Sequence, residues 1–183
     1  MKKWTLFLIT TLLVITGSAQ QAASKLDLRF GIGSSLLGTG DMQTIMFENE
    51  LNVHLNNYIT LGGGLGYARS DRGIREQASF TQLNANIYIS PFKNTRKNDF
   101  RLGTGASWYA ISDVYESTRI FENGQVVDVD YVFEKRNSIG FNVILENTYL
   151  ITEKYMLGVK LFTQPYQNGD INSGVLVKFG VNL

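Results

Sequence analysis

Residues 175–183, the last segment of the sequence, alternate strictly between large apolar side chains and side chains that are mostly small or polar. The apolar positions are Val175, Val177, Phe179, Val181 and Leu183. A repeat of two residues is typical of a β-strand with one apolar face. A strand at the end of a chain needs a partner on each edge, and closing the sheet into a barrel supplies both. The pattern therefore favours a closed β-barrel.

The N-terminal segment has the three parts of a secretory signal peptide. A basic start, an apolar core and small residues for cleavage are found at Lys2 and Lys3, at 4–15, and at Gly17 and Ala19. The apolar core is shorter than the roughly 20 residues that a helix needs to cross a bilayer, which favours a cleaved signal over a membrane anchor. We expect residues 1–19 to be the signal peptide and residues 20–183 to form one outer-membrane β-barrel domain.

Composition excludes several other classes of protein. The sequence has no cysteine, so disulfides, thiolate metal sites and a lipid attachment site of the bacterial lipoprotein kind are excluded. A formal net charge of +1 gives no electrostatic argument for a nucleic-acid partner. After the signal, no stretch is apolar enough for a spanning helix. If this chain is in a membrane, it must therefore cross as a closed barrel.

The same alternation recurs along the whole chain. Together with the final segment it predicts eight strands, at about 26–34, 45–55, 59–68, 82–90, 100–109, 139–146, 155–163 and 175–183. The expected turns on one side lie near 56–57, 91–98 and 147–154, and the loops on the other near 38–41, 69–77, 112–135 and 164–170. We expect an all-β fold, an eight-stranded antiparallel up-and-down transmembrane β-barrel.

Alternation alone does not say which face points into the barrel. A soluble lipocalin-like barrel would hold its apolar face inside. Three observations favour the inverted, membrane arrangement. The polar face is rich in glycine and small residues, and it carries nearly all the charges. The apolar face carries aromatic residues near the strand ends, as interfacial girdles require, at Tyr67, Phe100, Trp108 and Tyr155.

The segment between the fifth and sixth strands predicts a long hairpin. Asn-Gly is a strong signal for a two-residue type I′ turn. Centring the turn there pairs Trp108 with Ile139 and Arg101 with Glu146, which keeps both faces consistent. The arms then exceed the bilayer core, so 117–132 should project beyond it. We expect the following residues of this hairpin to be available for contact with a partner: Ile120, Phe121, Asn123, Gly124, Val126, Val129 and Tyr131.

Charges of both signs face the predicted interior in nearly equal number. They are Arg29, Glu48, Glu50, Arg101, Glu146, Lys160 and Lys178, together with Asp27. A buried charge is costly unless it is paired and hydrogen-bonded. Because an eight-stranded barrel is only wide enough for side chains to fill it, we expect a salt-bridge network that plugs the lumen. A charge-lined conduit is the alternative.

The chain resembles the small outer-membrane β-barrel proteins of Gram-negative bacteria, through its signal peptide, its alternating strands and turns such as Leu-Asn-Asn-Tyr-Ile-Thr-Leu-Gly at 55–62. The protruding hairpin is similar to that of OmpX-like members, and the turn at 149–158 is similar to those of Bacteroidetes barrels. The resemblance implies a monomer in the cell outer membrane, in contact with its lipid and with lipopolysaccharide. Family members often end in an aromatic residue, whereas this sequence ends in Leu183.

The sequence offers little for catalysis. His54 is the only histidine, and no His-x-Ser pairing follows it, since Leu55 and Asn56 come next, so we predict no enzymatic activity, no metal and no cofactor. Arg69, Arg72 and Arg75, expected in one loop, would either contact lipopolysaccharide phosphates or remain solvated.

Two functions from different classes remain open at this point. The first is a non-enzymatic surface protein whose plugged barrel anchors a hairpin that binds an extracellular protein. The second is a narrow channel or transporter for small solutes. An enzyme acting on membrane lipids ranks third.

Overall fold

The computed structural model describes residues 25–38, 42–71, 76–92, 97–122 and 125–183. The predicted signal peptide and its cleavage site lie outside these residues. Within the described part of the chain, no helix is long and apolar enough to cross a membrane.

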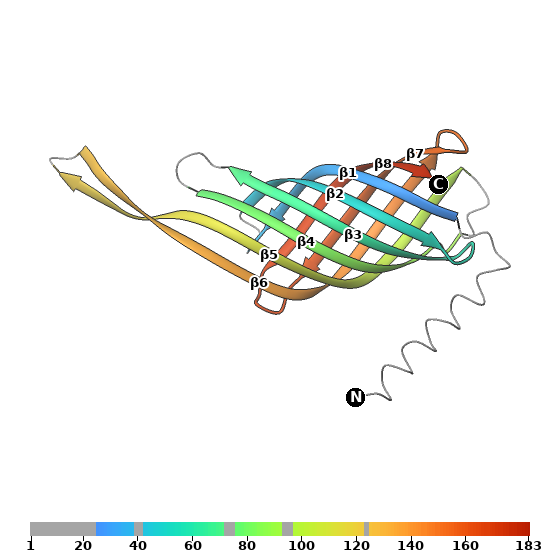
Figure 1. The fold of residues 1–183 in the computed structure, drawn as a ribbon, viewed down its shortest axis with the longest axis horizontal. Coiled ribbons are helices and arrows are strands. Elements are labelled where there is room, and N and C mark those ends of the chain that lie inside the picture. The colour runs from blue at the N-terminus through green and yellow to red at the C-terminus, as the bar shows by residue number, and fades with distance from the viewer. Residues whose placement is uncertain (1–24, 39–41, 72–75, 93–96, 123–124) are drawn as a thin grey trace, which may run out of the picture.

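Eight antiparallel strands form one closed barrel in which each strand pairs with its neighbours in the sequence (Figure 1). They are β1 (Lys25–Leu37), β2 (Met42–His54), β3 (Ile59–Asp71), β4 (Glu76–Ile89), β5 (Asn98–Glu122), β6 (Gln125–Leu150), β7 (Tyr155–Pro165) and β8 (Ile171–Asn182). The sheet closes between β1 and β8, where Leu28 lies opposite Val181 and Leu36 opposite Ser173. The predicted fold class is confirmed.

Apolar side chains face outward around the barrel, and polar ones face inward. Phe47, Leu65 and Phe141 expose 49%, 52% and 55% of their surface on the outside. Water disfavours so continuous an apolar surface, whereas the hydrocarbon core of a bilayer accepts it. Tyr67 and Trp108 also lie on the exterior, where they are exposed, although Trp108 lies well inside the long strand β5 and not near its end. The exterior is therefore that of a membrane-spanning barrel and not of a soluble one.

Several strands are longer than the sequence pattern indicated. β4 already begins at Glu76, and β3 continues to Asp71, so Arg69 lies within a strand and not in a loop as predicted. At the other end of the barrel β2 stops at His54, one residue before the predicted end. Cross-strand hydrogen bonding extends these strands past the membrane, where both faces meet polar surroundings and alternation in the sequence fades.

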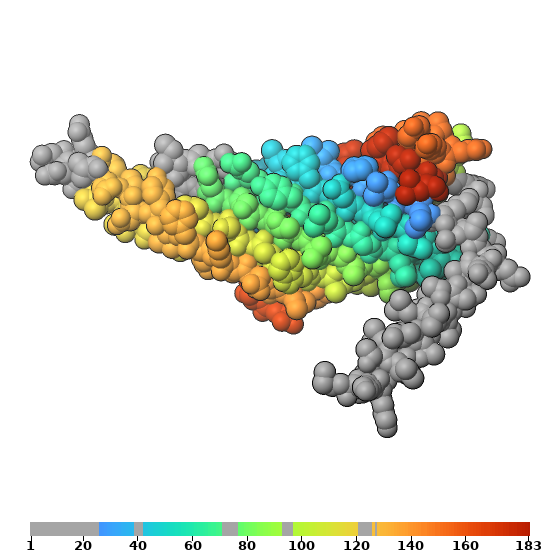
Figure 2. Space-filling model, viewed as in Figure 1, coloured from blue at the N-terminus to red at the C-terminus, as the bar shows by residue number. Residues whose placement is uncertain are grey.

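The β5–β6 hairpin projects far beyond the other strands (Figures 1 and 2). The pairings of Trp108 with Ile139 and of Arg101 with Glu146 are confirmed. The prediction assumed one continuous register along the hairpin, and this is wrong. The register shifts between Glu116 and Thr118, and shifts back between Ile120 and Phe121. Two β-bulges of opposite effect therefore interrupt the projecting part of the hairpin, residues 116–122 of β5 and 125–137 of β6, which we call the distal hairpin. Bulges of this kind bend a strand and increase its twist.

Candidate functional sites: the lumen cluster and the distal hairpin

The lumen cluster lies near the end of the barrel that carries the short turns. Its residues are Asp27, Arg29, Glu48, Glu50, Arg101, Glu146, Lys160 and Lys178, all of them almost completely buried. They come from β1, β2, β5, β6, β7 and β8, so the closure of the barrel is what brings them together. Four cations face four carboxylates, and the formal charges of the cluster cancel.

Two lysines hold the carboxylates of β2. Lys160 Nζ donates to Glu48 Oε1 at 2.7 Å and to Glu50 Oε2 at 3.0 Å. Lys178 Nζ lies 2.8 Å from Glu48 Oε1 and 3.0 Å from Glu50 Oε2. Both ammonium groups thus bridge the same pair of carboxylates, which ties β7 and β8 to β2 across the barrel axis.

Two arginines meet at Glu146 on β6. Arg29 donates to Asp27 through Nε at 2.7 Å and through Nη2 at 2.8 Å. Its Nη1 also donates to Glu146 Oε1, which accepts from Arg101 Nη2 at 2.7 Å as well. Arg101 Nη2 lies 3.6 Å from Glu50 Oε1, which joins the arginine half of the cluster to the lysine half.

Tyr88 on β4 completes the lumen cluster, and the sequence analysis did not identify its role. Its hydroxyl donates to Glu50 Oε2 at 2.7 Å, and the Arg101 guanidinium carbon lies 4.2 Å from the ring centroid. Gly62 and Gly103 make room for the ring, because a Cβ there would lie 2.8 Å and 2.6 Å from its atoms. An inward aromatic residue that faces glycines on both neighbouring strands is the signal that could have revealed it.

Above the lumen cluster the interior changes in chemistry. Buried amides fill the next part of the lumen: Gln82, Asn84, Asn86, Asn142, Gln164 and Asn172. Aromatic rings follow, with Tyr109 stacked on Phe80 at 5.2 Å and packed edge-on against Tyr166 at 4.3 Å between centroids. Side chains thus occupy the interior from the short-turn end towards the hairpin end, as the small diameter of an eight-stranded barrel requires.

The loop between β7 and β8 is fastened at the hairpin end of the barrel. Asp170 Oδ2 accepts hydrogen bonds from the Tyr109 hydroxyl, from Asn168 Nδ2 at 2.8 Å and from Arg136 Nε at 3.1 Å. Arg136 Nη1 also donates to Asp113 Oδ2 at 2.7 Å. Partial burial alone would raise the pKa of Asp170, but these hydrogen bonds and the Arg136 charge outweigh it and lower the pKa.

His54 has a hydroxyl neighbour that the sequence did not reveal. Its Nε2 lies 2.6 Å from Asp27 Oδ2, and its Nδ1 lies 2.9 Å from Thr60 Oγ1, because the pairing of β2 with β3 places Thr60 opposite it. The prediction looked for a nucleophile only directly after His54, at Leu55 and Asn56. Thr60 is only 2% exposed and Asp27 is held by Arg29, whereas the His54 side chain keeps 26% of its surface exposed.

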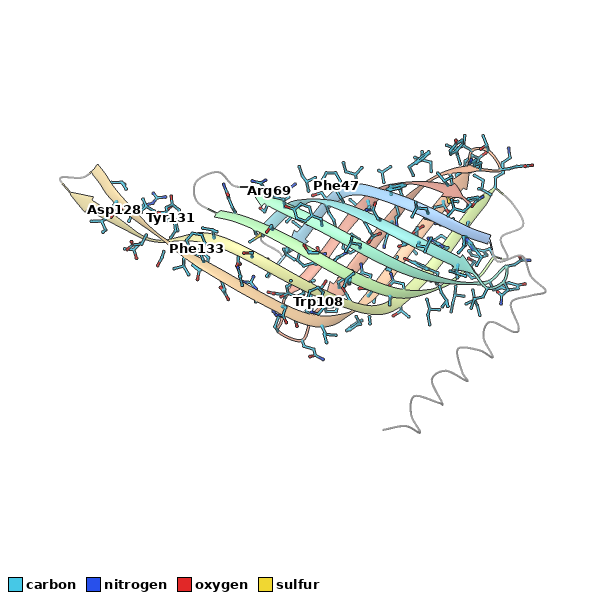
Figure 3. All side chains as sticks on the ribbon, viewed as in Figure 1. Phe47, Arg69, Trp108, Asp128, Tyr131 and Phe133 are labelled. Carbon is cyan, nitrogen blue, oxygen red and sulfur yellow. The ribbon has the colours of Figure 1, made fainter. Side chains whose placement is uncertain are left out.

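In the distal hairpin, β5 and β6 pair with each other, and the outer edge of each strand has no strand partner among the described residues. Pairing of β4 with β5 ends at Glu76 and Tyr115, and pairing of β6 with β7 ends at Val143 and Thr163. An isolated bridge between Gly140 and the β7–β8 loop follows. Beyond these points the described strands pair only with each other. Figure 3 labels Asp128, Tyr131 and Phe133 along this projecting part of β6.

The residues predicted for contact differ in their placement. Ile120 and Val126 expose 46% of their surface and Tyr131 exposes 39%, whereas Val129 is half-buried. Phe133, which the prediction did not include, is 77% exposed. Asn123 and Gly124 lie outside the described residues, and so do Arg72 and Arg75 of the predicted arginine loop. Nothing is described of the Phe121 side chain.

Among the described residues no group of three or more histidine, cysteine or acidic side chains could hold a metal ion. The geometry as a whole defines a membrane-type β-barrel with an ion-paired interior and one extended hairpin.

No protein-family model matches the chain, and no curated protein matches it. Solved structures do. The chain is similar to the attachment invasion locus protein Ail of Yersinia pestis, with a TM-score of 0.60, 9% identity, and coverage of 88% of this chain and 99% of that one. For Neisserial surface protein A the TM-score is 0.61 and the identity is 10%, with coverage of 88% of this chain and 98% of that one. For a major outer membrane protein of Thermus thermophilus the TM-score is 0.64 and the identity is 11%, with coverage of 88% of this chain and 100% of that one. At these identities the likeness is one of fold, and the fold is that of small outer-membrane barrels.

Proposed function

We propose that this protein is a non-enzymatic surface protein of the outer membrane of a Gram-negative bacterium. The barrel anchors it in the lipid, and the distal hairpin binds an extracellular protein by adding a strand of that protein to its open edge. Outer-membrane lipid, including lipopolysaccharide, surrounds the barrel. The observation that carries this proposal is the hairpin edge, which extends beyond every neighbouring strand of the described barrel.

The backbone of β6 supports strand addition. Ile139 O accepts a hydrogen bond from Gln167 N, so the main-chain groups of Ile139 point away from β5. Successive residues of an antiparallel strand turn their N–H and C=O groups to alternate sides. Tyr131, Phe133 and Lys135 therefore turn their main-chain groups towards the open edge. A row of such groups is a template for an incoming strand.

The interior supports the role of an anchor. Buried ion pairs of the lumen cluster link strands that are not neighbours in the barrel, β1 with β6 and β2 with β7, and amides and aromatic rings continue the filling. A side-chain-filled lumen of this width favours a closed interior over a channel. The activity of such a protein then lies on its surface, where the hairpin is the most extended feature.

An alternating threonine–valine peptide, as long as the β6 segment 129–137, tests strand addition. The mature protein in phosphatidylcholine nanodiscs should bind it. A peptide that is N-methylated at every second residue, so that it cannot pair, should not bind. Removal of residues 117–132, with the strands closed by an Asn-Gly turn, leaves too short an edge and should abolish binding. Heat-modifiable gel migration checks that the shortened barrel is folded. If the methylated peptide binds equally well, the proposal is wrong.

A further inference from the structure

A second apolar surface lies on β6 outside the lipid-facing belt. Val129, Tyr131 and Phe133 follow the outward face of the strand, and Phe133 exposes 77% of its surface. Lys135 and Asn137 separate these residues from Ile139, the first apolar residue of the belt on this strand. Phe133 is six positions from Ile139, or about 20 Å along the strand. Lipid contact does not account for an exposed aromatic residue so far from the belt, and such surfaces mark sites of protein interaction.

The opposite face of the same segment carries three exposed carboxylates. Asp128, Asp130 and Glu134 lie on it, because side chains two positions apart share a face of a strand, and the exposed Val132 lies between the last two. Two cations nearby, Arg119 and Arg136, already have carboxylate partners, whereas the exposed Lys135 shares the face of Phe133. Arg119 Nη2 donates to Glu116 Oε2 at 2.8 Å. Arg136 binds Asp113 and Asp170, and its Nη1 lies 3.6 Å from Glu134 Oε2.

The open edge has a defined beginning. Val129 N donates to the carboxylate of Asp128, with an N···Oδ1 distance of 2.9 Å, which occupies the main-chain donor of Val129. The main-chain groups that face the open side from there on belong to Tyr131, Phe133, Lys135 and Asn137, by the alternation set at Ile139. This row begins in the segment where Tyr131 and Phe133 lie on one face and Asp128 and Asp130 on the other.

We propose that the edge of β6 at 129–137 binds an extended protein segment in which basic and apolar side chains alternate. This inference rests on the proposed strand addition and specifies its partner. Side chains of an added strand alternate between the two faces in step with β6. One parity packs beside Tyr131 and Phe133, and the other lies beside Asp128 and Asp130. Directly opposite side chains on paired strands are about 5 Å apart, so opposite charges there attract and like charges repel.

The charge pattern also predicts which ligands this edge should not bind. Ail has also been solved in complex with sucrose octasulfate, a polyanionic heparin analogue. The exposed carboxylates of Asp128 and Asp130 would repel a polyanion of this kind, so we expect this edge not to bind one.

Three peptides of equal length with the same apolar parity test the inference. Their other positions are lysine, threonine or glutamate, and binding is measured by fluorescence anisotropy on the mature protein in phosphatidylcholine nanodiscs. The lysine peptide should bind roughly tenfold tighter than the threonine peptide, as two cross-strand charge pairs, with Asp128 and Asp130, allow. The glutamate peptide should bind most weakly. Asp130→Asn should weaken the lysine peptide alone, whereas Glu153→Gln, which removes one carboxylate at the exposed β6–β7 turn, should change nothing.

The outcomes separate this inference from the proposal it rests on. Equal binding of all three peptides, with loss on N-methylation, would retain strand addition and overturn the charge preference. A lysine peptide that binds equally well when N-methylated would be held by charge alone, and would overturn both. Failure of all three peptides would also overturn both. Self-association of the protein through this edge, detected as a dimer that excludes the peptides, would replace the foreign strand by a second copy and overturn the inference.

Discussion

The lumen cluster and the distal hairpin both contain carboxylate side chains, but these side chains have different roles in the two regions. In the lumen, four carboxylates and four cations are almost completely buried, and every one of them has a partner of opposite charge. On the hairpin, Asp128 and Asp130 lie in water, and no ion pair joins them to another described residue. β5 and β6 take part in both regions. The comparison teaches that burial, and not residue type, decides whether a charge holds the barrel together or remains available for a partner.

The largest expected effect comes from breaking the buried side of this comparison. Glu146→Gln removes a carboxylate shared by Arg29 and Arg101, and leaves two buried guanidinium groups short of negative charge. We expect the free energy of unfolding to fall by about 3–5 kcal/mol. Urea unfolding in lipid vesicles, followed by tryptophan fluorescence, measures it.

The matched change on the hairpin is Asp130→Asn, which also removes one carboxylate. It should alter the free energy of unfolding by less than about 0.5 kcal/mol, since surface substitutions usually do. If the two variants lost equal stability, the distinction between the regions would be wrong.

A smaller loss should follow from Gly103→Ala. The added methyl group would lie 2.6 Å from the Tyr88 ring, which in turn positions Arg101 and Glu50. Overpacking of this kind costs about 1–3 kcal/mol. Gly63 is the control, because an added Cβ there meets no atom within 4 Å on the outer face. An equal cost at Gly63 and Gly103 would show that strand flexibility, and not Tyr88 packing, sets the effect.

Acid should release the β7–β8 loop, which lies between the two regions. Because the pKa of Asp170 is lowered in the folded protein, its carboxylate stabilises the fold fully above the ordinary aspartate pKa of about 3.9. That contribution is lost as the pH falls below this value and through the lowered pKa. Amide hydrogen exchange at Gln167 and Gly169 should quicken over this range relative to other slow amides. Asp170→Asn should exchange faster at neutral pH and show no further acid step.

The smallest expected effect on stability is that of Phe133→Ser. The side chain is 77% exposed, so the free energy of unfolding should remain within about 0.5 kcal/mol of the original. Binding of all three alternating peptides should weaken together, because the change removes apolar contact and leaves the acidic face intact. A loss confined to the lysine peptide would contradict the assignment of Phe133 to the apolar face.

How far the sequence could predict the structure depends on how local each feature is. The period of two residues determined the faces of the strands, and the Asn-Gly position gave the pairing of Trp108 with Ile139, which is confirmed. The bulges near Glu116 and Ile120 cancel each other, so neither end of the hairpin reveals them. Beyond the membrane, polar and apolar residues both meet water, which is why the alternation no longer marked where β4 begins.

The candidate sites were harder to predict because they depend on neighbours across the barrel. The inward charges could be identified individually, but the roles of Tyr88 and Thr60 depend on which strands face them. Phe133 shares the parity of the lipid-facing residues of β6, and only its distance from the apolar belt separates it from them. The alternation in a sequence shows which face of a strand a residue occupies, whereas its distance from the membrane can be read only from the assembled barrel.

Single-channel recording in planar lipid bilayers tests most directly the claim that the lumen is closed and the hairpin carries the activity. The refolded mature protein, with its fold confirmed by heat-modifiable gel migration, should give a silent membrane. Reproducible conductance steps that change when Glu146 is replaced by Gln would contradict the account, and would make the lumen cluster the lining of a channel.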